Sequence, residues 1–281
     1  MTFKDTFTNT FTMTRIYTRK DVCSMKRMPV IFAGHGSPML AIEDSEQTRG
    51  LQQIGKEILQ NYGKPKAILA ISAHWYSMGT FIQSTPEPKQ IYDMYGFPDE
   101  LYKITYPVKG YMPLTKTVQS QLGNTVSSHD SWGIDHGTWT IIIHMFTKAD
   151  IPVVQLSING YLNAKKSYEL GKQLITLRDE GYLIIGSGNI VHNLGELEWN
   201  KVGGSTEAIA FNTAITNAVT SGDIKTVTHF ESLPHASYAV PTPEHYLPLS
   251  YTLGAADGDD VRIFNDLYST GSLSLTSYIW G

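Results

Sequence analysis

Three apolar segments of this chain each end shortly before a histidine, and this repeated arrangement constrains the fold more than any other feature. The segments have the length and the β-branched character of buried strands. The three pairs are residues 30–33 with His35, residues 67–71 with His74, and residues 182–185 with His192. In an open α/β sheet the carboxyl ends of the strands converge on the ligand crevice. The three imidazoles are therefore expected to meet there, and neutral imidazole is the commonest metal ligand in proteins.

The rest of the chain alternates between strand-like and helix-like segments. Further strands are expected at 80–84, 153–158, 261–264 and 273–278, and helices at 45–61, 113–122, 137–147, 163–179, 205–219 and 244–255. This alternation predicts a single α/β domain with a central, mostly parallel or mixed sheet flanked by helices, and an active site at the C-terminal ends of the strands. A long irregular stretch between residues 86 and 113, punctuated by proline and glycine, is typical of a lid or a binding loop.

The first 28 residues differ from the remainder of the chain. They are rich in Thr, Lys and Arg and carry no sustained apolar period, and they lack the apolar core of a secretion signal. We interpret residues 1–28 as a disordered leader or an extension from an upstream start codon, although a basic, hydroxyl-rich segment also fits a transit peptide. The folded domain is expected to span residues 29–281, with Cys23 outside it.

Charge and cysteine content argue against several classes of protein. The formal net charge is -4 and the isoelectric point about 6.1, so bulk electrostatics favour neither nucleic-acid binding nor a membrane surface. No apolar run approaches the ~20 residues that span a bilayer. The single cysteine excludes an internal disulfide framework and a cysteine-based zinc site, and it fits a cytoplasmic protein. The sequence does not indicate an oligomeric state.

His35 lies between two glycines and is followed by Ser37 and Pro38. Small neighbours let the backbone bend and bring the imidazole close to a ligand. A phosphate-binding loop is disfavoured because the segment lacks the Gly-Lys-Ser/Thr ending and the third glycine of the known phosphate loops. A serine nucleophile at Ser37 is disfavoured because the Gly-x-Ser-x-Gly elbow is absent. Metal ligation is the better interpretation of His35.

His74 and His192 extend this interpretation to the ends of two other strands. His74 is followed by Trp75, which supplies an aromatic wall, and a lone histidine at a strand end would more often be structural. Its pairing with His35 favours ligation. His192 follows a Gly-Ser-Gly-Asn turn and precedes Asn193, which can orient it through a hydrogen bond. His192 is interpreted either as a ligand or as a general base near the metal.

Residues 241–246 read Pro-Thr-Pro-Glu-His-Tyr, and their two prolines restrict the backbone. Thr242 is a plausible N-cap for a helix that begins at the second proline. Glu244 and His245 would then occupy the first turn, where only one of them can point into a given crevice. A glutamate at a helix start is explained by the macrodipole, whereas a histidine gains nothing there as a cation. His245 is therefore assigned to the metal.

A fifth cluster, residues 133–139, contains Asp135 and His136. Asp135 is expected to cap the following helix. His136 lies between this cap and a glycine, and it is interpreted as a group that binds substrate or transfers protons. The remaining histidines are assigned no role in the site; they are His129, His144, His229 and His235.

These motifs together resemble a known family. In chain order they are residues 34–39 (Gly-His-Gly-Ser-Pro-Met), 72–75 (Ser-Ala-His-Trp), 132–139 (Trp-Gly-Ile-Asp-His-Gly-Thr-Trp), 188–193 (Gly-Asn-Ile-Val-His-Asn) and 241–248 (Pro-Thr-Pro-Glu-His-Tyr-Leu-Pro). Their order is similar to that in class III extradiol ring-cleavage dioxygenases, and within these to the DOPA 4,5-dioxygenase type. The resemblance runs from about residue 28 to the C-terminus and implies an extradiol dioxygenase-like catalytic domain over residues 29–281.

The resemblance implies a non-heme Fe(II) enzyme that cleaves a small catechol, DOPA-like by resemblance, beside its two hydroxyls and inserts both atoms of O₂ to give a ring-opened semialdehyde. By position, His35, His74 and His245 resemble the metal ligands. His192 resembles the acid/base histidine that lies beside the metal, or a fourth ligand.

An all-histidine set departs from the two-histidine, one-carboxylate triad of better-known members and also suits Zn(II), which would then occupy purified protein without redox activity. A zinc hydrolase and a non-catalytic metal-binding protein on the same fold remain alternatives.

Overall fold

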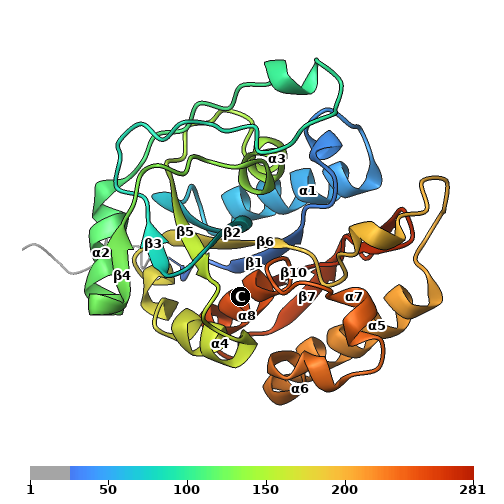
Figure 1. The fold of residues 1–281 in the computed structure, drawn as a ribbon. Coiled ribbons are helices and arrows are strands. Elements are labelled where there is room, and N and C mark those ends of the chain that lie inside the picture. The colour runs from blue at the N-terminus through green and yellow to red at the C-terminus, as the bar shows by residue number, and fades with distance from the viewer. Residues whose placement is uncertain (1–25) are drawn as a thin grey trace, which may run out of the picture.

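A mixed eight-stranded sheet runs through the centre of the structure, a computed structural model that describes residues 26–281 (Figure 1). The strand order is β4-β3-β5-β2-β6-β1-β10-β7. The strands of this sheet are β1 (Val30–Gly34), β2 (Ala67–Ser77), β3 (Thr80–Ile82), β4 (Val126–Ser128), β5 (Val153–Asn159), β6 (Tyr182–Gly188), β7 (Val261–Phe264) and β10 (Ser277–Trp280). Two short strands, β8 (Tyr268–Ser269) and β9 (Leu273–Ser274), form a separate hairpin-like pair.

The four central strands, β5, β2, β6 and β1, are mutually parallel. Val30 of β1 pairs with Ile184 of β6, and Ile68 of β2 pairs with Leu183 of the same strand. Because parallel strands end at the same edge of a sheet, the residues that follow β1, β2 and β6 lie close together. At one edge β10 is antiparallel to β1 and β7 is antiparallel to β10, and at the other edge β3 is antiparallel to β5 and β4 is parallel to β3. The predicted mixed α/β sheet is thus confirmed.

Helices cover both faces of the sheet, with α1 and α3 on one face and α4, α5 and α8 on the other (Figure 1). The helices are α1 (Glu46–Asn61), α2 (Met112–Leu122), α3 (His136–Met145), α4 (Ala164–Lys172), α5 (Thr206–Ser221), α6 (Ile224–Thr228), α7 (Ala236–Ala239) and α8 (Leu247–Ala256). The short 3-10 helices are Pro38–Ala41, Leu101–Lys103, Gly123–Thr125, Ile175–Arg178, Leu194–Glu196 and Phe230–Ser232. Coverage on both faces explains why the central strands are buried and largely apolar instead of alternating regularly with polar residues.

Two adjacent residues of β1 show how the chain divides its core between the faces. Ile31 packs with Leu51 of α1 on one side, whereas Val30 belongs to the opposite cluster with Leu249 of α8. These four side chains, those of Val30, Ile31, Leu51 and Leu249, are all buried. The alternation follows from the two-residue period of a strand.

Strand β2 is longer than the sequence predicts. The apolar run suggested an end before His74, but the strand continues to Ser77. Its register against β5 shifts between Ser72 and Tyr76, a local irregularity that re-aims side chains. His74 therefore lies inside this irregular part of the strand and not in a loop.

Helix α8 also begins later than predicted. Its first residue is Leu247, and its N-cap position is Tyr246, so Thr242 is not the N-cap and His245 is not in the first turn. The Thr242 hydroxyl instead donates to Glu244 Oε1 at 2.7 Å. The two prolines keep residues 241–245 in a turn that precedes the helix.

The expected leader covers residues 1–28, of which 1–25 lie outside the described residues. Residues 26–28 contact the domain. The buried guanidinium of Arg178 donates from Nε to the carbonyl of Met28 at 2.7 Å and from Nη1 to the carbonyl of Ala255 at 3.1 Å. Arg178 thus links the chain before β1 to the C-terminal end of α8, where cations satisfy free helix carbonyls.

Candidate metal centre

Five imidazoles gather where the central parallel strands end. They are His35 after β1, His74 in the irregular part of β2, His136 at the first residue of α3, His192 after β6, and His245 in the turn before α8. The ring centroids of His35 and His74 are 5.0 Å apart, and His245 lies 5.2 Å and 5.1 Å from these two rings. Residues distant in the sequence therefore form one cluster, as their positions at strand ends predict.

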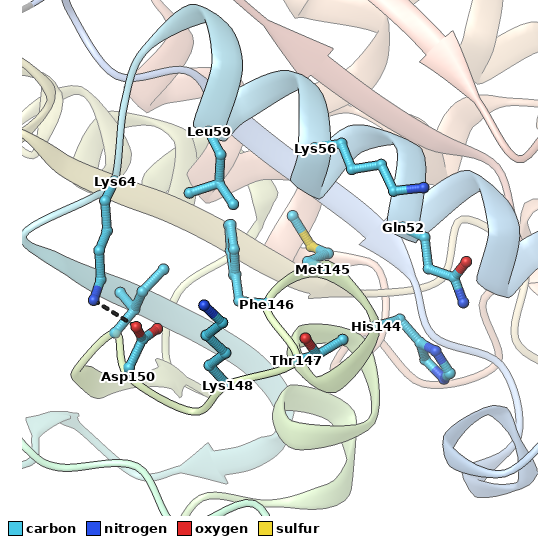
Figure 2. Close-up of a pocket in the computed structure, with 11 residues that line it drawn as sticks. Gln52, Lys56, Leu59, Lys64, His144, Met145, Phe146, Thr147, Lys148 and Asp150 are labelled. Atoms are coloured by element: carbon cyan, nitrogen blue, oxygen red, sulfur yellow. Dashed lines mark hydrogen bonds and ion pairs between the residues drawn. The ribbon is translucent and has the colours of Figure 1, made fainter.

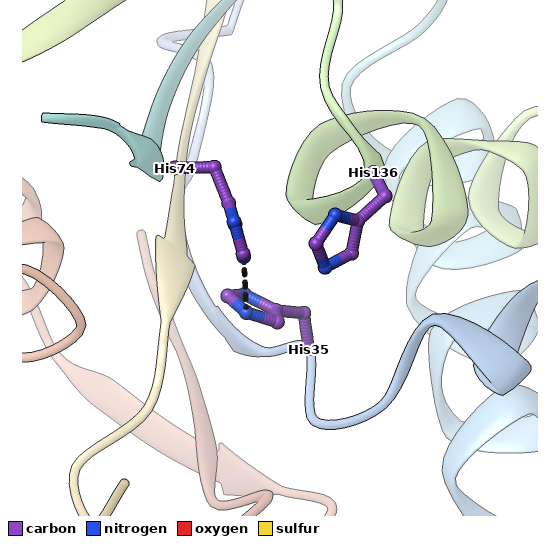
Figure 3. A group of neighbouring side chains, drawn as sticks. All are labelled: His35, His74 and His136. Carbon is purple, nitrogen blue, oxygen red and sulfur yellow. Dashed lines mark hydrogen bonds between the residues drawn. The ribbon is translucent and has the colours of Figure 1, made fainter. Parts of the chain in front are cut away.

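Within the cluster, His35, His74 and His136 form a group of three whose ring nitrogens are close enough to hold one metal ion (Figure 3). Each offers one ring nitrogen, and these three atoms all lie within 4.8 Å of one another. The Nε2 atoms of His35 and His74 are 3.1 Å apart. Two bare nitrogen lone pairs at this distance repel each other, and a cation or a proton between them would relieve that repulsion.

The hydrogen bonds around Ser187 determine the tautomer of His35. Ser187, on β6, donates its hydroxyl proton to the carbonyl of Gly137 in a short hydrogen bond. Its oxygen lies 2.9 Å from His35 Nδ1 and must therefore accept a proton from that nitrogen. Neutral His35 then carries its proton on Nδ1, which leaves the Nε2 lone pair free to face His74.

Asp93 lies against both of the other imidazoles. Its Oδ2 is 3.2 Å from His74 Nδ1, and its Oδ1 is 3.0 Å from His136 Nδ1. The backbone N–H of His136 donates to the same Oδ1 at 2.8 Å. The two ring contacts are close polar contacts rather than well-aligned hydrogen bonds, because neither ring N–H points straight at its oxygen.

His245 is buried and has a nitrogen without a hydrogen-bond partner. Its Nδ1 lies 3.4 Å from Glu244 Oε1, whereas its Nε2 is buried and unpaired. An unpaired buried polar atom is costly unless it binds something. His192 lies face to face with His245, with ring centroids 3.5 Å apart and planes inclined by 3°.

Burial sets the protonation of these rings. Burial and the neighbouring histidines lower the pKa of His35 and of His245 well below the ordinary value. Burial, followed by the charge of His74, lowers the pKa of His192 to about 4. These three rings are neutral at pH 7, the form that binds metals.

His74 behaves differently from these three rings. Burial alone would lower its pKa, but the contact with Asp93 and the charges of Asp135 and Glu244 outweigh burial and raise it. Burial would likewise raise the pKa of Asp93, yet its contacts with His136 and His74 hold that pKa far below its usual range. A protonated His74 can donate from Nε2 to His35 in the metal-free protein, and a metal ion would replace that proton.

The donor set fits a divalent transition metal. Ring nitrogens of His35, His74 and His136 lie within 4.8 Å of one another, and each ring with a resolved partner is anchored through its Nδ1, as is usual for metal-binding histidines. Imidazole suits Fe, Zn, Cu and Ni. Among the described residues, no cysteine or carboxylate belongs to this group of three donors.

Gly137 allows α3 to approach the cluster. A Cβ atom at this position would lie 2.7 Å from His74 Cδ2 and 2.8 Å from Ser72 Oγ, closer than a side chain can be accommodated. The start of α3 is fixed by Asp135, which is fully buried and accepts from the backbone N–H of Thr138 at 3.2 Å, as the predicted helix cap requires. Asp135 also accepts from the Ser72 hydroxyl at 2.7 Å.

The sequence interpretation named the five clustered histidines but not the groups that orient them. Asp93 lies in the long irregular stretch, where no periodic pattern or motif singles it out. Ser187 was included only as part of a flexible turn, and Glu244 was considered as a rival ligand. In the structure Glu244 lies beside His245 Nδ1, as an orienting group. Trp75, which the sequence suggests as an aromatic wall beside His74, is buried.

A cavity of about 430 Å³ lies away from the histidine cluster, between α1 and the C-terminal end of α3 (Figure 2). Its charged side chains include Lys56, Lys148 and the ion pair between Lys64 and Asp150. The one histidine that lines it, His144, lies 2.7 Å through Nε2 from the carbonyl of Leu40. This cavity contains none of the clustered imidazoles, so the candidate metal centre is a separate site.

Within residues 26–281, none of the helices combines the length and the apolar character that a bilayer crossing requires.

Comparison with known proteins places these observations in a family context. The model of the catalytic LigB subunit of aromatic ring-opening dioxygenase matches residues 29–280. A protein of Escherichia coli K12 named 4,5-DOPA dioxygenase extradiol is 39% identical over 265 residues, which cover 91% of this chain and 96% of that protein. A protein of the same name from Beta vulgaris is 35% identical and covers 88% of this chain and 94% of its own length.

The fold of this chain is also similar to that of a solved structure. The crystal structure of an uncharacterised protein from Escherichia coli K12 superposes with a TM-score of 0.79 at 35% identity, and the match covers 91% of this chain and all of the other.

Proposed function

Because the chain belongs to the class III extradiol dioxygenases, the family of the catalytic LigB subunit of aromatic ring-opening dioxygenases, we propose that it cleaves a catechol with Fe(II) and O₂ at the histidine cluster. The family assignment makes the chain an extradiol ring-opening enzyme of the DOPA 4,5-dioxygenase type. Beyond this family assignment, we propose the identity of the metal, the co-substrate O₂ and the particular catechol.

We assign the metal to His35, His74 and His245, with His192 as a fourth ligand or as an acid/base group beside it. Held by these residues, Fe(II) would supply Lewis-acid activation of the catechol and the redox chemistry that its reaction with O₂ requires. The observation that supports this assignment is that ring nitrogens of the proposed ligands lack hydrogen-bond partners that would satisfy them. The Nε2 atoms of His35 and His74 face each other at 3.1 Å, and the Nε2 of His245 is buried without a partner.

Side chains of this protein would then accept and return the protons that the reaction releases and consumes. A catechol loses protons as its oxygens are bound, and a neutral imidazole beside the metal can accept one. His192 is neutral at pH 7 because burial lowers its pKa to about 4. We propose His192 as this base and as the acid that returns the proton during ring opening. His136, whose Nδ1 contacts Asp93, is proposed to hold the substrate or to assist proton transfer.

A DOPA-like substrate is proposed from the names of two relatives, the 4,5-DOPA dioxygenase extradiol proteins of Escherichia coli and Beta vulgaris. The product would be a ring-opened semialdehyde. None of the motifs that carry the cluster contains an arginine or a lysine to bind a substrate carboxylate. The general claim of catechol cleavage is therefore independent of the claim that the natural catechol is an amino acid.

Metal exchange tests the proposal against a hydrolytic role. The metal-free protein is loaded with Fe(II) under anaerobic conditions or with Zn(II), and each form is given a catechol in the presence of O₂. The proposal expects a yellow ring-opened product from the Fe(II) form alone, because zinc has no redox chemistry. A Zn(II) form that hydrolyses ester or amide substrates, with an Fe(II) form inactive on every catechol, would support the hydrolase instead.

A further inference from the structure

Asp93 is the only acidic side chain in the described residues that lies within 4.0 Å of ring nitrogens of two clustered imidazoles. It comes from the long irregular stretch after β3, far in sequence from both partners. Its Oδ2 lies 3.2 Å from His74 Nδ1 and its Oδ1 lies 3.0 Å from His136 Nδ1. We propose that Asp93 is a positioning residue that keeps both imidazoles protonated on Nδ1, so that their Nε2 atoms stay available at the metal centre.

At these distances the carboxylate of Asp93 determines which nitrogen of each ring carries the proton. An ionised carboxylate only accepts hydrogen bonds, so a ring nitrogen within 3.2 Å of it must carry a proton or be repelled. Asp93 acts as an acceptor at this place, because its Oδ1 accepts the backbone N–H of His136 at 2.8 Å. Neutral His74 and neutral His136 must then both be Nδ1–H tautomers, with Nε2 free.

The position of Asp93 is fixed independently of the histidines. Two residues earlier, the backbone N–H of Ile91 donates to the carbonyl of Ile134 at 3.0 Å. The indole Nε1 of Trp139, on α3, donates to the carbonyl of Ile91 at 3.1 Å. The Tyr92 hydroxyl donates to the carbonyl of Ile104 at 2.5 Å. The stretch that carries Asp93 is thereby anchored to the helix that carries His136, so the carboxylate is pre-organised before any ligand binds.

The inference rests on the proposed function only where it concerns the metal; the tautomers are a property of the metal-free protein. An amide cannot replace the carboxylate here. In Asp93→Asn the amide oxygen is expected at the Oδ1 position, where it accepts from the backbone N–H of His136, so the NH₂ group faces His74 and donates to its Nδ1. That ring must move its proton to Nε2, which blocks the atom that would bind the metal.

The test combines tautomers with metal affinity. Long-range ¹H–¹⁵N correlation spectra of the metal-free protein, recorded above the pKa of His74, report which ring nitrogen is protonated. We expect Nδ1–H for both His74 and His136 in the unaltered protein. In Asp93→Asn we expect one of the two rings to become Nε2–H and the Kd for Zn(II) to rise about 10- to 100-fold, the usual effect of losing an orienting partner.

Asp93→Glu keeps the carboxylate and should recover part of the affinity. Asp99→Asn is the matched control, because Asp99 is exposed on the same stretch, and it should bind Zn(II) like the unaltered protein. An Nε2–H tautomer at either ring in the unaltered protein overturns the inference, even if Asp93→Asn fails to fold. The inference is also overturned if the Kd of Asp93→Asn for Zn(II) stays within about twofold of that of the unaltered protein. Failure of the unaltered protein to bind any divalent metal would refute the proposed metal centre and leave the tautomer result to decide the role of Asp93.

Discussion

The imidazoles of His192 and His245 lie face to face, with centroids 3.5 Å apart and planes inclined by only 3°. Two rings this close cannot both carry a positive charge without strong repulsion, and each pKa is lowered, first by burial. The stack therefore holds a neutral base against a neutral ring with a free Nε2. If His245 binds the metal, the His192 ring lies directly against a metal ligand.

Because His192 stacks on His245, a substitution that keeps the ring can separate the role of His192 in proton transfer from its role in packing. His192→Phe keeps an aromatic ring against His245 but has no nitrogen to transfer a proton. We expect kcat on a catechol to fall about 10²- to 10⁴-fold while the bound Fe(II) is retained, as measured by metal analysis and steady-state kinetics. Loss of metal from this variant would instead make His192 a fourth ligand, and unchanged kcat would remove it from the mechanism.

The three proposed ligands should behave alike. Single substitutions His35→Ala, His74→Ala and His245→Ala should each lower the metal content of protein purified with iron supplied, because each removes one buried donor. His229→Ala is the control, since His229 is exposed on the surface. A variant that keeps the metal content of the control would remove that histidine from the ligand set.

His136 is expected to act on substrate rather than to hold the metal. His136→Ala should raise KM for the catechol at least as strongly as it lowers kcat, because lost positioning appears in binding of the substrate. Titration of the metal into the same variant checks the assignment. A large loss of metal affinity would make His136 a ligand, an outcome compatible with its place in the group of three with His35 and His74.

Stability of the metal-free protein should fall as the pH falls from about 6.5 toward 4. Burial lowers the pKa of His35, His192 and His245 in the folded state. The unfolded chain therefore binds more protons than the folded one in this window, and each ring removes about 1.4 kcal/mol per pH unit. His74 has a raised pKa, so its contribution is fully present below 6.5 and is lost only at higher pH.

Chemical unfolding at pH 7 and pH 5 measures this dependence. His192→Phe should flatten the slope, because one of the three protonating rings is gone. A free energy of unfolding that stays constant between these two pH values would contradict the neutral, buried state assigned to the cluster.

Much of the fold follows from the sequence, because β1, β5 and β6 are apolar runs of strand length covered on both faces. The end of β2 was predicted too early, since polar residues interrupt the apolar pattern where the strand continues through an irregular register to Ser77. The start of α8 was predicted too early because Thr242, a good N-cap residue, bonds to the Glu244 side chain instead of to backbone N–H groups.

The clustering of the histidines was predictable for a topological reason, as parallel strands end at one edge of the sheet. The groups that orient them were not. Asp93 reaches His74 and His136 through a long irregular stretch, and contacts of this kind depend on tertiary structure rather than on local pattern. Ser187 orients His35 across two neighbouring strands, which only the register of the sheet reveals.

The most direct test of the central claim is the stoichiometry of O₂ consumption. Fe(II)-loaded protein is mixed with a limiting amount of L-DOPA or a simpler catechol, and dissolved O₂, hydrogen peroxide and the ring-opened product are measured together. Extradiol cleavage predicts one O₂ consumed per ring opened, with both oxygen atoms in the product and no peroxide released. Catechol that stays intact across the panel, or O₂ uptake matched by peroxide without ring opening, would contradict it.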